Sequence, residues 1–283
     1  MIDETVEEIR EMQTHSSSVV AVKAAAALRE LLDRDYPTAE EYVRDLERNS
    51  NALQRANPSH ATLHTTQKEI LGAVSSLENT SLEEAQARTA EVIDRVIEEV
   101  ETAKSRAAER GAAVFEDGTT VLTHDYSSTV LEALELAARD GNHLTVYVTE
   151  ARPRYLGRKT ARTLAGIDRI ETHLITDAAA GHFLPEVDRV VVGMDCIVGD
   201  TFYNRVGTFP IAATAAEIGV PMTVIGSSAK LIEDGFAFEN EFRSPSEVMR
   251  EPAEGFSVEN PAYDATPTRL LTEVVTDDGV KEF

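Results

Sequence analysis

Apolar residues change their spacing once along this chain. Up to about residue 112 they recur at every third or fourth position, a pattern that predicts amphipathic helices. Asn57-Pro58-Ser59 interrupts this region, and Ser81 followed by Glu84 is a capping box that predicts the start of a long helix. Helices are therefore expected over residues 18–32, 39–46, 65–77 and 82–107.

From Asp117-Gly118 onward, short β-branched runs alternate with helical stretches. This alternation is typical of a mostly parallel sheet that carries helices on both faces. The sequence therefore predicts an N-terminal α-helical domain over residues 1–112 and an α/β domain over residues 113–283. The expected strands are residues 120–123, 144–148, 171–175, 190–192 and 221–225, and the helices between them include residues 129–138, 161–167 and 208–218.

Acidic residues are spread along the whole chain. Its 283 residues include 50 Asp and Glu against 27 Lys and Arg, which gives a formal net charge of -23. A surface of this charge repels polyanions, so direct binding to nucleic acid is not expected. The even spread is typical of adaptation to a high-salt cytoplasm, where charges are screened within about 3 Å at 1 M salt.

The N-terminus is acidic and polar, whereas a signal peptide is basic and then apolar, and no apolar run reaches about eighteen residues. We therefore expect a cytoplasmic protein that does not bind a membrane. Cys196 is the only cysteine, which argues against a disulfide framework or a thiolate metal cluster. Neither a metal nor a cofactor is expected.

The strand, helix, strand unit over residues 188–230 carries candidate ligand groups. Ligands of open parallel sheets bind beyond the carboxyl ends of the strands, so Asp195, Asn204, Arg205 and Gly207 are expected on one rim. Free backbone N–H groups at Gly207 and Thr208, with Arg205 beside them, would suit a phosphate. A capped helix with an exposed arginine accounts for these residues equally well.

The loop after residues 144–148 is basic within an acidic chain. Glu150, Arg152, Arg154, Gly157 and Arg158 lie close together in this loop. Guanidinium groups pair with phosphate through two hydrogen bonds, so the arginines suggest an anionic ligand. Salt bridges to the acidic surface are the alternative.

The loop after residues 120–123 contains His124, Asp125 and Ser127, with Ser127 placed to cap the following helix. His124 and Asp125 could be combined with Cys196 into a catalytic group. A lone cysteine is far more often a small buried hydrophobic residue than a nucleophile.

Several motifs occur in one order over residues 120–280: Thr123-His124-x-Tyr126-Ser127, VTEARPRYLGRKTA from Val148, VVVGMD from Val190, Asn204-x-Val206-Gly207-Thr208 and NPAYDATP from Asn260. Together they resemble a superfamily with two groups. One group comprises the alpha, beta and delta regulatory subunits of translation initiation factor 2B. The other comprises aldose-phosphate isomerases that act on methylthioribose 1-phosphate or ribose 1,5-bisphosphate. The resemblance implies an N-terminal helical domain followed by a Rossmann-like α/β domain, and assembly into homodimers or larger oligomers.

The two groups differ in their site chemistry. The isomerases resemble one another in a cysteine directly after Thr-His and an aspartate in a Gly-Ala-Asp loop, which together could move protons. Asp195 matches that aspartate, but Asp125 stands in the place of the cysteine. The Arg-Gly-Ala and Arg-Pro-Thr motifs of the isomerases appear here as His15-Ser16-Ser17 and Asn57-Pro58-Ser59.

The resemblance therefore favours a non-catalytic protein similar to the initiation-factor subunits. Such a protein would bind a phosphorylated sugar or nucleotide, and a translation initiation factor would be a candidate partner. The alternative is an aldose-phosphate isomerase that uses Asp195 and a substitute for the thiol at Asp125. The implied ligand-binding residues are His124, Ser127, Glu150, Arg152, Gly157, Arg158, Asn204, Arg205 and Gly207.

Overall fold

A computed structural model describes residues 2–10, 17–75, 80–233, 235–251 and 254–283 of the chain. These residues form two compact units: Met1–Ala103 with Gly235–Glu239, and Lys104–Asp234 with Asn240–Phe283. The division lies within helix α5 (Leu82–Ala112), whereas the boundary expected at residue 112 lies at the end of that helix. His15 and Ser16, which were compared with the Arg-Gly-Ala motif, lie outside the described residues.

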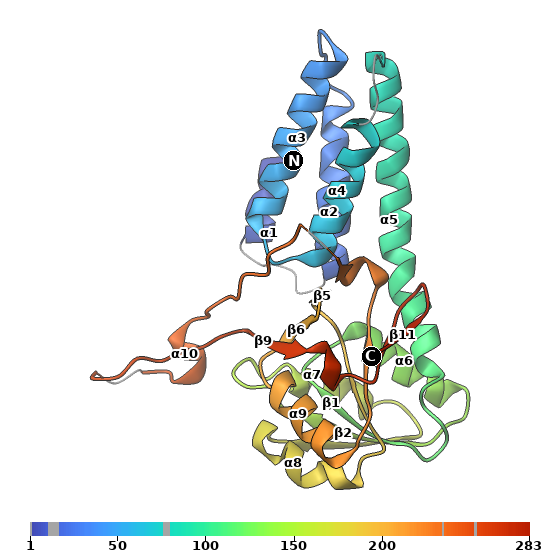
Figure 1. Ribbon diagram of the computed structural model, residues 1–283, viewed down its shortest axis with the longest axis vertical. Helices are drawn as coiled ribbons and strands as arrows, with labels where there is room; N and C mark the ends of the chain where they lie inside the picture. Colours follow the sequence, from blue (N-terminus) through green and yellow to red (C-terminus); the bar gives the residue numbers. More distant parts are fainter. Residues whose placement is uncertain (1, 11–16, 76–79, 234, 252–253) are drawn as a thin grey trace. The chain divides into compact units, whose positions relative to one another are not determined.

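The first unit is a bundle of helices, as expected (Figure 1). Its core consists of buried apolar side chains such as Leu28, Tyr42, Leu53 and Ile70. Helix α1 was not expected, because its sequence is short and rich in acidic residues and has few apolar residues for the core, with Ile2 and Ile9 buried there. The helices are α1 (Ile2–Arg10), α2 (Ser17–Ala27) continued by the 3-10 turn η1 (Leu28–Leu31), α3 (Ala39–Ala56), α4 (Ala61–Ser75) and α5.

The capping box at the start of α5 is confirmed. The Ser81 hydroxyl accepts the Glu84 N–H at 3.2 Å, and the Glu84 carboxylate accepts the Ser81 N–H at 3.0 Å. These bonds satisfy two of the N–H groups that a helix start leaves without partners. The sequence therefore specifies where this helix begins.

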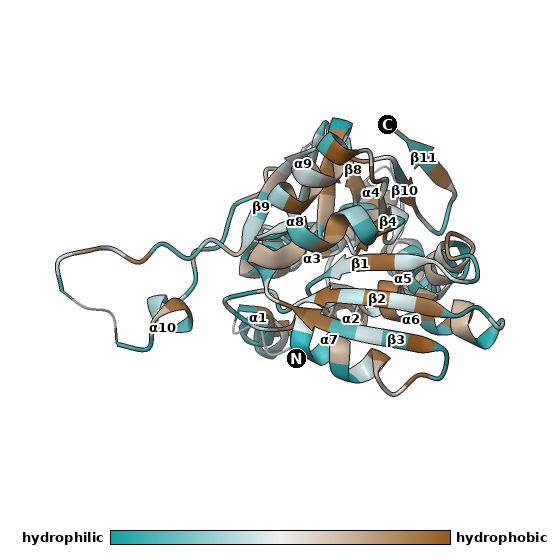
Figure 2. Cartoon of the chain, turned by 90° about the horizontal axis from the view of Figure 1, so that it is seen from below, coloured by the Kyte–Doolittle hydropathy of each residue, from teal (hydrophilic) through white to brown (hydrophobic). Residues whose placement is uncertain are grey.

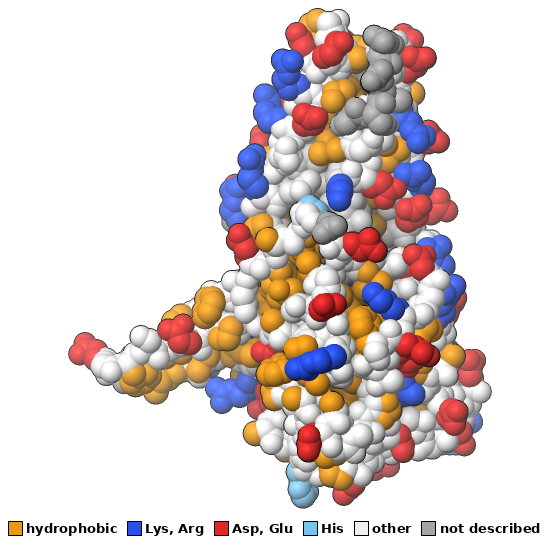
Figure 3. Space-filling model, viewed as in Figure 1, with side chains coloured by type: hydrophobic (Ala, Val, Ile, Leu, Met, Phe, Trp, Pro, Cys, Tyr) orange, Lys and Arg blue, Asp and Glu red, His pale blue; other side chains and the backbone are white. Residues whose placement is uncertain are grey.

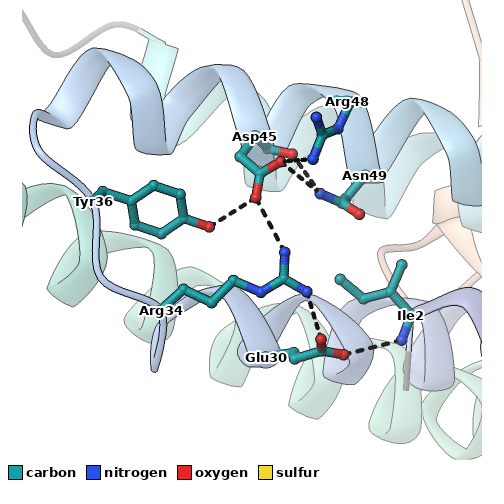
Figure 4. Close-up of polar contacts among 7 residues, drawn as sticks. All are labelled: Ile2, Glu30, Arg34, Tyr36, Asp45, Arg48 and Asn49. Carbon is teal, nitrogen blue, oxygen red and sulfur yellow. Dashed lines mark hydrogen bonds and ion pairs between the residues drawn. The ribbon is translucent and has the colours of Figure 1, made fainter.

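A polar network centred on Asp45 joins three segments of this unit (Figure 4). Asp45 accepts a hydrogen bond from the Tyr36 hydroxyl at 2.8 Å and pairs with Arg34, which also pairs with Glu30. Glu30 in turn accepts the Ile2 N–H of α1 at 3.2 Å. Burial and the hydrogen bond to Asp45 raise the pKa of Tyr36 to about 12, so Tyr36 acts as a hydroxyl donor at neutral pH.

The second unit is built on a seven-stranded sheet (Figure 2), which is mostly parallel, as the alternating pattern predicted. The strand order is β11-β10-β7-β4-β1-β2-β3, and all neighbours are parallel except β10 and β11. The expected strands correspond to β1 (Thr120–His124), β2 (Leu144–Thr149), β3 (Ile170–Ile175), β4 (Arg189–Val192) and β7 (Met222–Ile225). Two strands that were not expected, β10 (Glu273–Val275) and the edge strand β11 (Val280–Glu282), complete the sheet.

Helices cover both faces of this sheet. Successive side chains of its central strands point to opposite faces, and those on both faces are buried. Val121 packs with residues of α6 (Ser128–Arg139) and α7 (Gly157–Leu164). Leu122 packs with α8 (Ala180–Phe183) and α9 (Thr208–Ile218) on the opposite face. The mostly parallel α/β fold is therefore confirmed.

A second, four-stranded sheet was not expected. It has the order β8-β5-β6-β9 and consists of β5 (Cys196–Val198), β6 (Thr201–Arg205), β8 (Leu231–Ile232) and β9 (Tyr263–Pro267). The predicted strand at 190–192 and helix at 208–218 are joined by β5 and β6, which form a hairpin that buries Ile197, Phe202 and Asn204. A further short helix, α10 (Pro245–Val248), follows β8 in the chain.

None of the helices in the described ranges is both long and apolar enough to cross a membrane.

Candidate functional site

A cleft lies where the loops after β1 and β2 meet the end of β6 in the second unit. The side chains around it nearly fill it and leave a cavity of about 20 Å³, on the order of a single water. The residues that line it are Asp125, Ala151, Arg152, Pro153, Arg154, Arg205, Val206, Arg243 and Ala262. Of the residues predicted from the sequence, Asp125, Arg152 and Arg205 are therefore brought together here.

Arg205 stands beside two carboxylates at this cleft. Its Nε lies 3.5 Å from an oxygen of Asp125 and 3.9 Å from an oxygen of Asp195. The guanidinium group also lies over the ring of Tyr263, 4.6 Å from the ring centroid. Asp125, which directly follows β1, adopts a left-handed backbone with φ of 63° and is only 6% exposed.

The surroundings of the cleft raise the pKa values of both Asp125 and Arg205, for different reasons. Burial raises the pKa of Asp125, and the nearby Asp195 adds to this effect, while Arg205 and His124 oppose it. Burial disfavours the charge of Arg205, but Asp195, Tyr263 and Asp125 outweigh burial and raise its pKa. Arg205 therefore stays cationic, and Asp125 holds a proton more readily than an exposed aspartate.

His124 is held by the protein through both ring nitrogens. Its Nε2 donates to the carbonyl oxygen of Val206 at 2.9 Å, which leaves Nδ1 to accept from the Thr149 hydroxyl at 2.6 Å. A Cβ atom at Gly207 would lie 2.7 Å from the imidazole, and Gly207 has φ of 107°. In this arrangement His124 positions the loop after β1 and offers no ring nitrogen to a ligand.

The N-terminus of α9 is occupied by a carboxylate of the chain itself. Asp264 accepts the Gly207 N–H at 2.8 Å and the Phe209 N–H at 2.9 Å. The expectation that the Gly207 N–H is free for a phosphate is therefore not met, because Asp264 already supplies the anion that a helix N-terminus favours. Asn204 is also buried and donates to the Thr208 hydroxyl at 3.0 Å, so it stabilises the same helix start.

Three arginines surround the cleft beside Arg205. Arg152 donates to the carbonyl oxygen of Val248 at 3.1 Å. Arg243 binds Glu247 through its guanidinium at 2.7 and 2.9 Å. Burial, together with the charges of Arg243 and Arg205, lowers the pKa of Arg154, while Glu247 and Asp125 oppose this effect.

The remaining predicted ligand residues have roles within the fold. Arg158 pairs with Glu150 at 2.7 Å and lies over the ring of Tyr155 at 3.8 Å. For Arg158 the alternative interpretation as a salt bridge is therefore the one that the structure supports. Ser127 caps α6 by accepting the Val130 N–H at 3.3 Å.

Gly157, a predicted ligand residue, and Cys196, a weak catalytic candidate, are both fixed by packing. Gly157 packs so tightly that a Cβ atom there would lie 1.8 Å from the carbonyl oxygen of Thr149. Cys196 is fully buried, and burial and Asp195 raise the pKa of its thiol, so the thiol stays protonated. In the described part of the chain, no group of three or more His, Cys, Asp and Glu side chains is arranged to hold a metal ion.

Several residues at the site were missed from the sequence. Lys230 donates to the carbonyl oxygen of Met194 at 2.6 Å and so fixes the backbone next to Asp195. Tyr263 and Asp264 belong to the NPAYDATP motif, which was noticed but given no role. Arg243 follows β8 in a segment without a recognisable pattern, so no sequence signal placed it at the cleft.

The fold and the cleft define a class of α/β proteins whose ligand site lies at the carboxyl ends of parallel strands. Within that class, the chain belongs to the initiation factor 2 subunit family, whose model matches residues 13–282. The solved structure of the translation initiation factor eIF-2B from Pyrococcus horikoshii OT3 is similar, with a TM-score of 0.78 and 26% identity. The match covers 99% of this chain and 96% of that one.

Curated relatives are similar over nearly the whole chain. The ribose 1,5-bisphosphate isomerase of Haloterrigena turkmenica is 32% identical and covers 97% of this chain and 88% of its own length. The ribose 1,5-bisphosphate isomerase of Methanocaldococcus jannaschii is 31% identical and covers 99% of this chain and 91% of its own length.

These relatives overturn the interpretation of the chain as a protein that binds its ligand without turnover. That interpretation depended on the missing cysteine at position 125. The group that replaces the thiol is a buried carboxyl with a raised pKa, and such a group can itself carry a proton. The comparisons give no support to a translation initiation factor as a partner of this chain.

Proposed function

We propose that this protein is an aldose-phosphate isomerase that converts ribose 1,5-bisphosphate into the corresponding ketose bisphosphate. The relatives named as isomerases of this sugar support the proposal. The structural observation that carries it is the buried carboxyl of Asp125, which shares Arg205 with the carboxylate of Asp195.

The reaction requires two proton transfers at oxygen and the movement of one hydrogen between carbons. When the C1–O bond of the sugar ring breaks, the ring oxygen takes up a proton. The hydrogen on C2 moves to C1, so that C2 is oxidised and C1 is reduced, and the C2 hydroxyl releases its proton as the C2 carbonyl forms. Two carboxyl groups in different environments suit this chemistry, since one can start protonated and the other ionised. Asp125, which is the more buried of the two, is the proton donor in this proposal, and Asp195 is the acceptor.

The arginines of the cleft support a substrate with two phosphates. Each phosphate is a dianion, and guanidinium groups bind phosphate through two hydrogen bonds. Arg152, Arg154, Arg205 and Arg243 gather around one cleft in a chain whose net charge is -23. Because the cavity is only about 20 Å³, these side chains turn outward when the sugar enters.

The direct test is turnover of ribose 1,5-bisphosphate by the purified protein in molar potassium chloride, followed by NMR detection of the ketose. We expect a rate of at least about 1 per second. Asp125→Asn and Asp195→Asn should each lower this rate by ~10²–10⁴-fold, the usual contribution of a positioned acid or base. Asp168→Asn, the same substitution at an exposed position, is the matched control and should keep the rate.

Absence of ketose from the folded wild-type protein would refute the proposal. Methylthioribose 1-phosphate, which carries one phosphate, tests whether the arginines select a substrate with two phosphates. It should react much more slowly than ribose 1,5-bisphosphate if they do.

A further inference from the structure

Arg205 and Tyr263 lie directly opposite each other in the second sheet. β6 and β9 are antiparallel, and their register pairs Arg205 with Tyr263 and Asn204 with Asp264. Opposite residues of antiparallel strands point to the same face, and neighbours along a strand point to opposite faces. Asn204 and Asp264 therefore lie on the face towards the start of α9, which both of them stabilise. On the other face the Tyr263 ring lies beside Arg205, with its centroid 4.6 Å from the guanidinium carbon.

The backbone of Tyr263 is also fixed by Asn240. The Asn240 side chain accepts the Tyr263 N–H at 3.2 Å and donates to the Tyr263 carbonyl oxygen at 2.8 Å. Both bonds use backbone atoms of Tyr263, so they persist with any other side chain at this position. The place of the ring is therefore set by the strands and by Asn240.

Tyr263 is neutral and suited to hold a cation. Burial raises its pKa to about 12, with Asp195 adding to this effect and Arg205 opposing it, so the hydroxyl stays protonated at neutral pH. The face of an aromatic ring attracts a cation, and the attraction is stronger where water is excluded. The Arg205 side chain is only 21% exposed, so its contact with the ring is largely shielded from water.

The ring restricts where the guanidinium group can lie. The chain has 50 Asp and Glu, and Figure 3 shows carboxylates scattered over the face of the molecule that it draws. A guanidinium group that turned outward would meet water and other carboxylates. The contact with Tyr263 instead keeps the cation 3.5 Å from Asp125 and 3.9 Å from Asp195.

A cation between the two aspartates matters for the proposed isomerisation, on which this inference rests. In that reaction Asp125 gives a proton to the ring oxygen and becomes ionised, while Asp195 takes the proton of the C2 hydroxyl and becomes neutral. Water then removes the proton from Asp195 and returns one to Asp125, which restores the site. The negative charge thus moves from one carboxyl to the other in each turnover, and one cation must balance it in both places.

We propose that Tyr263 is a positioning residue of this reaction, whose ring holds the Arg205 guanidinium between the two aspartates while the charge moves between them. The two distances from Nε differ only slightly, so Arg205 can serve both carboxyls with a small displacement along the ring. Tyr263 acts through its ring and through Arg205, without contact with the sugar.

Separate measurement of kcat and KM for ribose 1,5-bisphosphate in molar potassium chloride tests this role. Tyr263→Phe keeps the ring and should keep kcat. Tyr263→Leu loses the ring and should lower kcat by up to ~10²-fold, the cost of a misplaced catalytic group. KM should change much less, because the other arginines of the cleft still bind the phosphates. Phe283→Leu, which removes the contact of another ring with Lys281 outside the site, is the matched control and should keep kcat.

A kinetic double-mutant cycle tests whether Tyr263 acts through Arg205. Arg205→Lys should lower kcat in the wild type but have little further effect in Tyr263→Leu, because the cation is already misplaced there. Independent effects of the two substitutions would overturn the proposal. A loss in Tyr263→Phe as large as in Tyr263→Leu would also overturn it, since the hydroxyl and not the ring would then be required.

The wild type separates the role of Tyr263 from the proposed function. No ketose from the folded wild type would refute the isomerase and this role with it. Ketose formation with the same kcat in Tyr263→Leu and the wild type would refute the role of Tyr263 alone. Far-ultraviolet circular dichroism shows whether each variant is folded, and Tyr263→Met, which also lacks the ring, replaces Tyr263→Leu if the latter does not fold.

Discussion

The Nε atom of Arg205 lies 3.5 Å from a carboxylate oxygen of Asp125, in the place where related isomerases are expected to keep a cysteine. A thiol at this position would need no cation beside it. A buried carboxyl does, because an isolated carboxylate in the protein interior is strongly disfavoured. The arginine and the aspartate therefore form one unit, and the consequences of changing either residue follow from their pairing.

Replacing Asp125 by asparagine should make the folded protein more stable at neutral pH. The ordinary pKa of this carboxyl is 3.8 and the fold raises it. Its contribution to stability is therefore full below pH 3.8 and is lost as the pH rises through the raised pKa. We therefore expect Asp125→Asn to be more stable than the wild type at pH values above this raised pKa, because the wild-type carboxyl has lost its contribution there. Thermal unfolding at pH 5 and pH 8 measures this gain, which should be smaller at pH 5.

A pH-independent difference between Asp125→Asn and the wild type would show that the carboxyl does not titrate in this range. Asp168→Asn serves again as the control, because Asp168 is exposed. Its stability should match that of the wild type at both pH values.

Removing the charge of Arg205 should make the folded protein less stable. Arg205→Met leaves Asp125 and Asp195 without their shared cation, and breaking a buried ion pair in this way costs about 3–5 kcal/mol. Arg205→Lys keeps the charge but loses the planar contact with Tyr263, so its loss should be smaller. Urea unfolding of both variants measures the difference.

A double-mutant cycle measures how strongly Arg205 and Asp125 are coupled in stability. When Asp125→Asn is added to Arg205→Met, one of the two unpaired carboxylates disappears, so part of the stability should return. If the two changes in the free energy of unfolding are additive, Arg205 and Asp125 are not coupled and their pairing does not stabilise the fold.

The sequence predicted the central strands and most helices because their signals are local. β-branched runs such as 190–192 and the Ser81–Glu84 capping box each depend on a few neighbouring residues. The second sheet was missed because β5 and β8 have only three and two residues. β8 and β9 pair with the hairpin of β5 and β6 only through contacts between distant segments, and a short apolar run carries no sign of such a partner.

Local signals also indicated three residues of the candidate site. Asp125, Asp195 and Arg205 were found because they follow recognisable strands and motifs. The role of Asp264 could not be found, since its hydrogen bonds to Gly207 and Phe209 join residues more than fifty positions apart. Without that contact the N-terminus of α9 looked like a free phosphate site.

Asp264 should stabilise the start of α9 as a cap. Asp264→Ala removes the acceptor for both the Gly207 and the Phe209 N–H, and loss of a cap costs about 0.5–2 kcal/mol. Asp264→Asn keeps an acceptor oxygen and should lose less. Chemical unfolding of the two variants measures the difference, and equal stability of Asp264→Ala and the wild type would rule out the capping role.

The stability of the protein should rise with salt. A net charge of -23 on 283 residues implies repulsion within the folded chain, which ions relieve by screening. We expect the melting temperature to increase from about 0.1 M to 1 M potassium chloride, over which the Debye length falls from about 10 Å to 3 Å. A variant with Glu98→Gln and Glu101→Gln, both exposed on α5, carries less negative charge and should gain less from the same salt. Sucrose, which favours burial of apolar surface without screening charge, should stabilise the variant and the wild type equally. A melting temperature that stays flat or falls as potassium chloride is added would contradict adaptation to high salt.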